Sequence, residues 1–280
     1  VDEVRVDKLG NLIATKKGDR PSIMIDAHAD EIGLMVKQID EKGFIRFIRI
    51  GGWFDQTLLN QRVIVHTSSG PVVGVIGSKP PHVMKDEDRK KVVEAKDMFI
   101  DIGCSNQVEV EELGILPGTP ISIDREFVPM HGDTVTGKAF DNRAGLVMMI
   151  EALKRTKSKS TIYAVAAVQE EVGLKGAKVA AFGLDPDIAI ASDVTIPGDH
   201  PGIEKKDAPI EMGKGPVLVV ADGSGRGLIA TPQVIEWLVG TAKEFEIPVQ
   251  LEASDGGTTD ATSIYLTRSG IPTGVISVAT

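Results

Sequence analysis

Residues 161–168 read TIYAVAAV, and nearly every side chain in this run is apolar. A continuous apolar run of this length is typical of a strand that is buried on both faces of a sheet. In the preceding segment 142–156, apolar residues recur at helical spacing, for example at Leu146, Met149 and Leu153. A helix followed by a doubly buried strand predicts an α/β core.

The same alternation of strand and helix continues elsewhere in the chain. Residues 188–191 and 217–221 repeat the buried-strand pattern, and 22–28 resembles them more than the β segments that follow it. Thr231-Pro232 supplies an N-cap and a first-turn proline for a helix predicted over 231–246. These elements predict one α/β domain that is discontinuous in sequence.

A β-rich insert interrupts this domain. Short β-branched runs at 62–67 and 72–77 flank Ser68-Ser69-Gly70-Pro71, which is a hairpin-type turn and indicates antiparallel pairing. We therefore predict an insert over residues 52–127, with residues 1–51 and 128–280 forming the α/β domain.

Composition and charge exclude several classes of protein. The 280-residue chain is 42% hydrophobic, which suffices for a buried core, and its net charge of −9 disfavours nucleic acid and membranes as partners. No segment reaches membrane-spanning length, and the first residues do not resemble a signal peptide. The single cysteine, Cys104, excludes an internal disulfide framework and predicts a reducing compartment, so we expect a cytoplasmic protein.

Acidic and imidazole side chains follow the predicted parallel strands, at the edge where α/β folds place their ligands. His28, the pair Glu170-Glu171 and Asp193 each come directly after such a strand, and Asp141 stands where a loop meets the first helix. An oxygen-rich set with one imidazole suits zinc, cobalt or manganese, which activate water for hydrolysis. Two such ions would need a bridging carboxylate.

The spacing of neighbouring residues indicates which of them can bind a metal and which can act on the water or on the imidazole. Asp30 lies two residues after His28, so on a strand both face one side, and the carboxylate can hold the imidazole tautomer. The adjacent Glu170 and Glu171 project to opposite sides of an extended segment. One of them can therefore bind a metal while the other reaches the attacking water.

Each of these residues also has a purely structural interpretation. A His-x-Asp pair can be a surface feature, and a Glu-Glu pair at a strand end is usually solvated. Asp141 can be a helix N-cap, a position that Asp favours, and Asp193 can cap a turn before Pro197-Gly198. Taken singly, none of these residues establishes a metal site.

Four motifs, in this order along the chain, resemble a single family. They are Met24-Ile25-Asp26-Ala27-His28-Ala29-Asp30-Glu31-Ile32-Gly33, Gly137-Lys138-Ala139-Phe140-Asp141-Asn142-Arg143-Ala144-Gly145, Val168-Gln169-Glu170-Glu171-Val172-Gly173 and Ala191-Ser192-Asp193. The sequence resembles the tetrahedral (TET) aminopeptidases, also known as deblocking aminopeptidases and often labelled cellulase M or endoglucanase. The resemblance extends over essentially the whole chain, including residues 256–261 and 270–277.

This resemblance implies a metallo-aminopeptidase fold, in which a mixed sheet is sandwiched by helices and a small PDZ-like β-barrel is inserted. It implies two divalent metal ions, zinc or cobalt with manganese as a third option, and Asp141 as the carboxylate that bridges them. His28 and Asp193 then complete one site, and Glu171 belongs to the other. Glu170 becomes the general base. Independently of the resemblance, its spacing to His28 makes Asp30 a second candidate catalytic residue. The implied substrates are short peptides, which lose their amino-terminal residues.

The resemblance also implies self-association. In the family the β insert mediates dimerisation, and the dimers build hollow tetrahedral dodecamers that admit only peptides. Trp53 and Phe54 are candidate interface aromatics, and a core position in the insert explains them equally well. In the family a histidine beyond the position of Thr280 completes the second metal site, so we expect native residues to be missing from this sequence.

Two other functions stay open on the sequence. A glycoside hydrolase, which the endoglucanase label suggests, needs two carboxylates that face each other across a sugar, usually with aromatic platforms. The chain has only two Trp and two Tyr, and the adjacent Glu170 and Glu171 cannot easily oppose one another. An inactive or truncated assembly subunit would keep the shell interface and lack a complete metal site.

Overall fold

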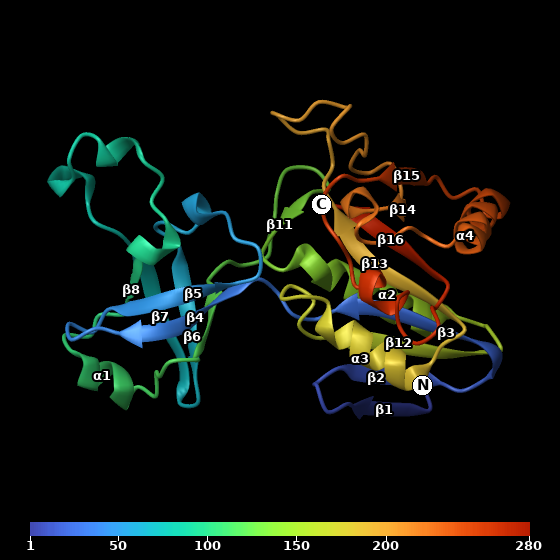
Figure 1. Cartoon of the computed structure of the whole chain (residues 1–280), viewed down its shortest axis with the longest axis horizontal. Coiled ribbons are helices and arrows are strands. Elements are labelled where there is room, and N and C mark those ends of the chain that lie inside the picture. The colour runs from blue at the N-terminus through green and yellow to red at the C-terminus, as the bar shows by residue number, and fades with distance from the viewer. The chain divides into compact units, whose positions relative to one another are not determined.

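The computed structural model describes residues 1–280, apart from the side chain of Asp88. The chain forms two compact units (Figure 1). Unit 1 consists of Val1–Asp30 and Ala139–Thr280, and unit 2 consists of Glu31–Lys138. The predicted fold class is confirmed, because unit 1 holds a large mixed sheet with helices and unit 2 holds a closed antiparallel barrel.

Unit 1 is built on an eight-stranded mixed sheet. In spatial order its strands are β1 (Glu3–Val6), β2 (Leu12–Lys16), β12 (Ser160–Ala167), β3 (Asp19–His28), β13 (Ile188–Thr195), β16 (Thr273–Ala279), β14 (Val217–Ala221) and β15 (Gln250–Ala253). The central strands β12, β3, β13 and β16 are parallel. The flanking pairs β1–β2 and β14–β15 join them through antiparallel contacts. The carboxyl ends of the four central strands therefore lie at one edge of the sheet.

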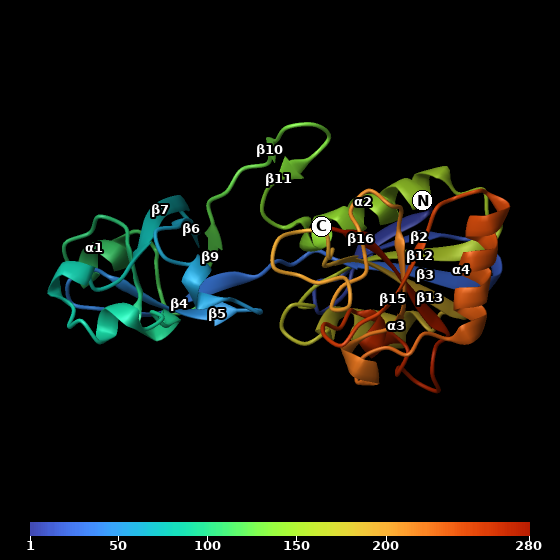
Figure 2. The ribbon, with the colours of Figure 1, turned by 90° about the horizontal axis from the view of Figure 1, so that it is seen from above.

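Helices cover both faces of this sheet. They are α2 (Phe140–Arg155), α3 (Lys175–Leu184), α4 (Pro232–Glu244) and the short α5 (Ala261–Ile264). Figure 2 shows α2 and α3 on opposite sides of the sheet. Ala164 and Val165 of β12, whose side chains point to opposite faces, are both buried, as the apolar run predicted. The helices predicted over 142–156 and 231–246 appear as α2 and α4, with small shifts at their ends.

Unit 2 is a closed barrel with its own core. Its strands, in order around the barrel, are β4 (Gly33–Ile39), β5 (Ile45–Ile50), β8 (Phe99–Asp101), β7 (Gly70–Gly77), β6 (Arg62–Thr67) and β9 (Pro120–Ile123). The same unit contains the helix α1 (Gln107–Glu112) and the two-residue strands β10 (Val128–Pro129) and β11 (Val135–Thr136). Thr67 pairs with Gly70, so Ser68 and Ser69 form the tip of the predicted hairpin. Ile45, Val63 and Ile100 are fully buried in the barrel core.

The barrel unit is larger than the insert that the sequence predicts. We expected residues 1–51 in the α/β domain, but unit 2 already begins at Glu31 and ends only at Lys138. The reason is that β4 and β5 pair with each other and with β9 and β8, which closes the barrel. Without these two strands the barrel would have open edges with unpaired backbone groups. No helix in the described chain is long and apolar enough to cross a membrane.

Candidate active site

The parallel strands of unit 1 bring the predicted site residues together. His28 is the last residue of β3, and Glu170 and Glu171 lie in the loop that follows β12. Ala167 at the end of β12 pairs with His28, so this loop leaves the sheet beside the imidazole. Asp141 lies in the first turn of α2, which packs against β3 and β13. Residues far apart in sequence therefore converge at one edge of the sheet.

Asp193 occupies a different position from the one that the sequence indicates. We expected it just past a strand, but it lies inside β13, which continues to Thr195. The strand is longer because β16 pairs with it as far as Ala279, and Asp193 itself lies opposite Ser277. Its side chain is only 6% exposed. Asp193 therefore lies within the regular sheet, where its position is well constrained.

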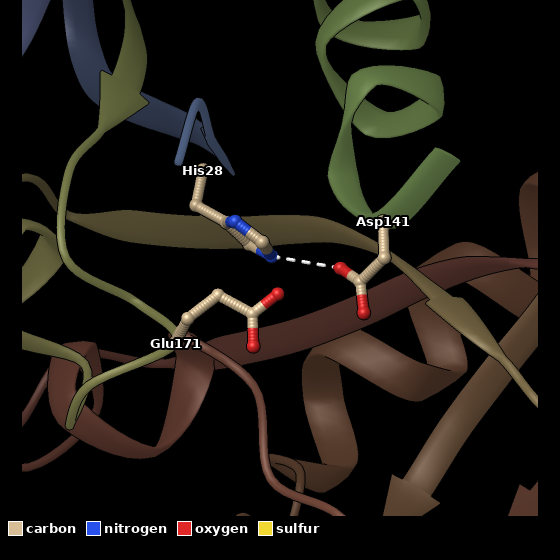
Figure 3. Close-up of side chains that lie close together, drawn as sticks. All are labelled: His28, Asp141 and Glu171. Carbon is tan, nitrogen blue, oxygen red and sulfur yellow. Dashed lines mark ion pairs between the residues drawn. The ribbon is translucent and has the colours of Figure 1, made fainter. Parts of the chain in front are cut away.

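His28 stands at the centre of the cluster, and its side chain is 1% exposed. Its Nε2 lies 3.0 Å from Asp141 Oδ1, 3.8 Å from Glu170 Oε2 and 4.0 Å from Asp193 Oδ1. Figure 3 shows the carboxylates of Asp141 and Glu171 close to the imidazole, with the ion pair to Asp141 marked. A single imidazole is thus shared among several carboxylates.

Asp30 makes contacts beyond those that its spacing suggested. The nearest hydrogen-bonding atom to His28 Nδ1 is the main-chain oxygen of Asp30, at 3.1 Å, whereas the Asp30 carboxylate is 3.6 Å away. The carboxylate accepts hydrogen bonds from the main-chain N–H groups of Glu170 and Glu171, at 3.0 and 3.2 Å. Asp30 therefore holds the Glu170-Glu171 segment against the end of β3.

The helix-capping interpretation of Asp141 does not match the structure. The N-cap of α2 is Ala139, and Asp141 has extended backbone angles of φ −79° and ψ 104°. The next residue, Asn142, is buried and donates from Nδ2 to the Ser192 carbonyl of β13 at 2.8 Å, while its Oδ1 accepts from Gly145. Asn142 thereby ties the start of α2 to the strand that carries Asp193. The Asp141 carboxylate is left to face His28.

The cluster holds several carboxylates close together, and the single imidazole of His28 cannot balance their negative charge. Burial opposes protonation of His28, but interactions with Asp141 and Asp30 and the charges of Asp193 and Glu170 outweigh it and raise its pKa to about 12. Burial raises the pKa of Glu170 to about 9, although the charge of His28 opposes this rise. Burial likewise raises the pKa of Glu171 and of Asp193 to about 7, and the charge of Asp141 adds to both shifts. A cation would relieve this repulsion.

The donor atoms fit a divalent metal. Ligand atoms of His28, Asp141 and Glu171 all lie within 4.8 Å of one another, and so do those of His28, Glu170 and Asp193. Carboxylate oxygens with one imidazole form a donor set that suits zinc, cobalt or manganese. The two triads share His28 and together form one cluster of five residues.

Two buried carboxylates beneath the cluster were not singled out from the sequence. Asp26 and Asp260 are 0% and 2% exposed, and their carboxyl groups lie within hydrogen-bonding reach of each other, with no other donor among the described residues. Burial raises the pKa of Asp26 to about 7, although the hydrogen bond with Asp260 opposes this rise. Burial also raises the pKa of Asp260, and the neighbouring charge of Asp26 adds to that rise. For Asp26 the signal in the sequence was a charged residue within the apolar run 23–27, and for Asp260 it was the segment 256–261, which shares the family resemblance.

A cluster of carboxylates around a buried imidazole at the carboxyl edge of an α/β sheet is typical of a metal-dependent hydrolase site. The family model for M42 glutamyl aminopeptidases, Peptidase_M42, matches residues 10–280. The lysyl aminopeptidase of Pyrococcus furiosus is 39% identical over 280 residues, which cover 99% of this chain and 79% of that protein. The chain belongs to the M42 aminopeptidase family.

Solved structures agree with this assignment. A TET aminopeptidase from a marine-sediment Thaumarchaeota archaeon has a TM-score of 0.94 and 45% identity, covering 99% of this chain and 78% of the other. A TET peptidase of Pyrococcus horikoshii, which can assemble into a tetrahedron or a large octahedral shell, has a TM-score of 0.87 and 32% identity over 98% of this chain and 80% of the other. The predicted resemblance to TET aminopeptidases is confirmed.

Proposed function

We propose that this protein removes amino-terminal residues from short peptides, using two divalent metal ions. The observation that carries the proposal is the convergence of two triads that share His28, one with Asp141 and Glu171 and the other with Glu170 and Asp193. Membership of an aminopeptidase family supports the reaction, and the composition of the cluster supports the use of metal.

Asp141 is the proposed bridging ligand. The pKa values of Asp193 and of Glu171 are raised first by burial and then, among other charges, by that of Asp141, so its carboxylate is close to both. In this assignment His28 and Asp193 complete one metal site, and Glu171 belongs to the other. The two ions would be zinc or cobalt, with manganese as a third option.

Glu170 is the proposed general base. Its side chain is 11% exposed, and its main chain is held by Asp30, so the carboxylate is both desolvated and positioned. When bound, divalent ions polarise the scissile carbonyl and lower the pKa of water. Glu170 would take the proton of the attacking water and return it to the departing amine. Asp30 supports this step by fixing the segment that carries the base.

Hydrolysis of amino-acyl anilides tests the proposal directly. Activity should vanish after exhaustive chelation and return on addition of zinc or cobalt, with close to two equivalents of metal bound per chain. Hydrolysis of cellulose that persists after chelation, with no anilide turnover, would favour a glycoside hydrolase instead. At most one equivalent of metal with no turnover would favour an inactive assembly subunit.

Self-association is part of the proposal. Trp53 packs against the barrel core and donates from Nε1 to the Gly33 carbonyl at 2.8 Å, whereas Phe54 is 64% exposed. Of the two candidate aromatics, Phe54 is therefore the one available for a dimer contact. We expect dimers that build a tetrahedral dodecamer. Light scattering should show a smaller particle for Phe54→Ser and an unchanged one for Val73→Ser, an exposed position elsewhere on the barrel.

A further inference from the structure

The cavity beside the candidate metal cluster carries more negative charge than metal binding requires. It has a volume of about 770 Å³, and eight carboxylate side chains line it. None of the residues described around it is lysine or arginine. Four of the carboxylates belong to the metal cluster, and the other four are Asp207, Asp222, Glu252 and Asp255.

Two of these additional carboxylates are buried in the cavity wall. Asp222 follows β14 and is 4% exposed, and Glu252 in the neighbouring strand β15 is 8% exposed. Asp222 Oδ1 accepts a hydrogen bond from the main-chain N–H of Leu228, but its Oδ2 has no partner in the described chain. Both oxygens of Glu252 lie within 3.0 Å of Thr195 Oγ1, and that hydroxyl has a single proton to donate. Glu252 therefore keeps free acceptor capacity beside the cavity, whereas the unpaired oxygen of Asp222 is buried in the wall and contributes its charge.

Two buried hydroxyl groups in the same wall are also unpaired. Thr259 Oγ1 and Ser277 Oγ line the cavity and have no hydrogen-bond partner among the residues described. Buried polar atoms without partners are unfavourable, so these hydroxyls add polar character to the wall around the two carboxylates.

The buried carboxylates also lack a counter-ion. Neither Asp222 nor Glu252 forms an ion pair with any described residue. Burial raises the pKa of Glu252, and the charge of Asp222 adds to that rise despite the bond from Thr195. Burial raises the pKa of Asp222 as well. A cation within hydrogen-bonding reach would offset the cost of both buried charges.

The remainder of the wall suits an aliphatic chain. Val194, Ile203 and Val219 line the cavity together with the carboxylates. A lysine side chain combines an apolar stem with a terminal ammonium that donates three hydrogen bonds, and an arginine side chain has a similar division. An acidic side chain would meet only repulsion from this wall.

We propose that this cavity receives the side chain of the amino-terminal residue of the substrate, and that Asp222 and Glu252 select lysine or arginine there. The inference rests on the proposed function, since it assumes that a peptide amino terminus is bound at the adjacent metal cluster. It adds a substrate class, peptides that begin with a basic residue.

Three amides that differ only in the amino-terminal side chain test the inference. The metal-loaded protein is assayed with the 4-nitroanilides of lysine, norleucine and glutamate. Norleucine keeps the four-carbon chain of lysine and the α-amine, and it lacks only the ε-ammonium. We expect kcat/KM for the lysine anilide to exceed that for the norleucine anilide by about tenfold or more, because a hydrogen bond to a charged group has an effect of this size. The glutamate anilide should be the poorest substrate.

Two isosteric variants identify the residues responsible. Glu252→Gln and Asp222→Asn should each reduce the ratio of kcat/KM for the lysine anilide to kcat/KM for the norleucine anilide by about threefold or more. The metal content should stay unchanged. Glu236→Gln, an exposed position on α4, is the matched control and should leave the ratio unchanged. Binding of lysinamide and norleucinamide, measured by calorimetry, provides a readout independent of turnover and should show the same order.

The outcomes separate this inference from the proposed function. Anilide hydrolysis without a preference for lysine over norleucine would overturn the inference and leave the aminopeptidase assignment intact. An equal loss for lysine and norleucine in both variants would also overturn it, because the carboxylates would then act on a part common to both substrates. Failure to hydrolyse any of the anilides would contradict the proposed function itself. In that case the calorimetric measurement still tests the inference, and equal binding of lysinamide and norleucinamide would overturn it.

Discussion

The carboxylate of Asp30 accepts a hydrogen bond from the main-chain N–H of Glu170, with 3.0 Å between oxygen and nitrogen. Its second oxygen accepts from Glu171, and its main-chain oxygen lies 3.1 Å from His28 Nδ1. One short residue therefore aligns three functional residues on two different strand ends. Substitutions of Asp30 should therefore lower catalysis by displacing these residues, although Asp30 itself is not proposed to contact the substrate.

Replacement of Asp30 by alanine should lower kcat/KM by about 10- to 100-fold, since the segment carrying Glu170 loses both of its acceptors. Asp30→Asn keeps one acceptor oxygen and should be intermediate. Asp40→Ala removes a similar carboxylate, which accepts two main-chain N–H groups in unit 2, and serves as control. Steady-state kinetics together with metal analysis measure the effect. Wild-type kinetics for Asp30→Ala would contradict the positioning role.

Replacement of Glu170 by glutamine should reduce kcat by about 10²- to 10⁴-fold, because the amide cannot accept the proton of the attacking water. The metal content should stay close to that of the parent protein, since Glu170 is not a proposed ligand. Single-turnover kinetics and elemental analysis test the two parts separately. If turnover is unchanged while metal stays bound, Glu170 is not the base.

Replacement of Asp141 by asparagine should release both metal ions, since one carboxylate is proposed to serve both sites. Asp193→Asn, which affects one proposed site, should retain about half of the metal. Equilibrium dialysis followed by elemental analysis distinguishes these cases. Two tightly bound ions in Asp141→Asn would exclude a bridging role.

The metal-free protein should lose stability as the pH rises from about 5 to 9. The pKa of Glu170 is raised from 4.5 to about 9, and that of Asp193 from 3.8 to about 7, so the folded state holds protons that the unfolded state releases. The stability from these groups is present below their unfolded pKa values and is lost as the pH rises through the folded values. His28, raised from 6.5 to about 12, contributes with the same sign.

Thermal unfolding of chelator-treated protein checks this dependence. The melting temperature should fall across that pH range, and apparent metal affinity should rise over it, because deprotonated ligands bind more tightly. The variant Glu236→Gln, which alters an exposed carboxylate, should follow the parent curve. A melting temperature that is constant or rises with pH would contradict the prediction.

Local sequence patterns were sufficient for the α/β core and for the residues that converge on it. The apolar run 161–168 became β12, buried on both faces, because burial of consecutive residues leaves a direct trace in composition. The segment 142–156 became α2 for a similar reason, since helical spacing is a property of one segment. Motifs at strand ends also placed His28 and the Glu170-Glu171 pair correctly relative to these strands.

Local patterns were insufficient where partners come from distant segments. The strands β4 and β5 belong to the barrel only because β9 and β8, far along the chain, pair with them. Asp26 and Asp260, whose carboxyl groups meet in the interior, are more than two hundred residues apart in sequence.

The amino-acid sequence alone predicted which residue types gather at the ends of the parallel strands, because residue types and the strands that carry them are local features. Only the tertiary structure decided which atoms meet: the carboxylate of Asp30 with the N–H groups of Glu170 and Glu171, and Asp222 and Glu252 in one cavity wall. The physical reason is that hydrogen bonds and electrostatic coupling depend on distances of a few ångströms, which the pairing of distant strands sets.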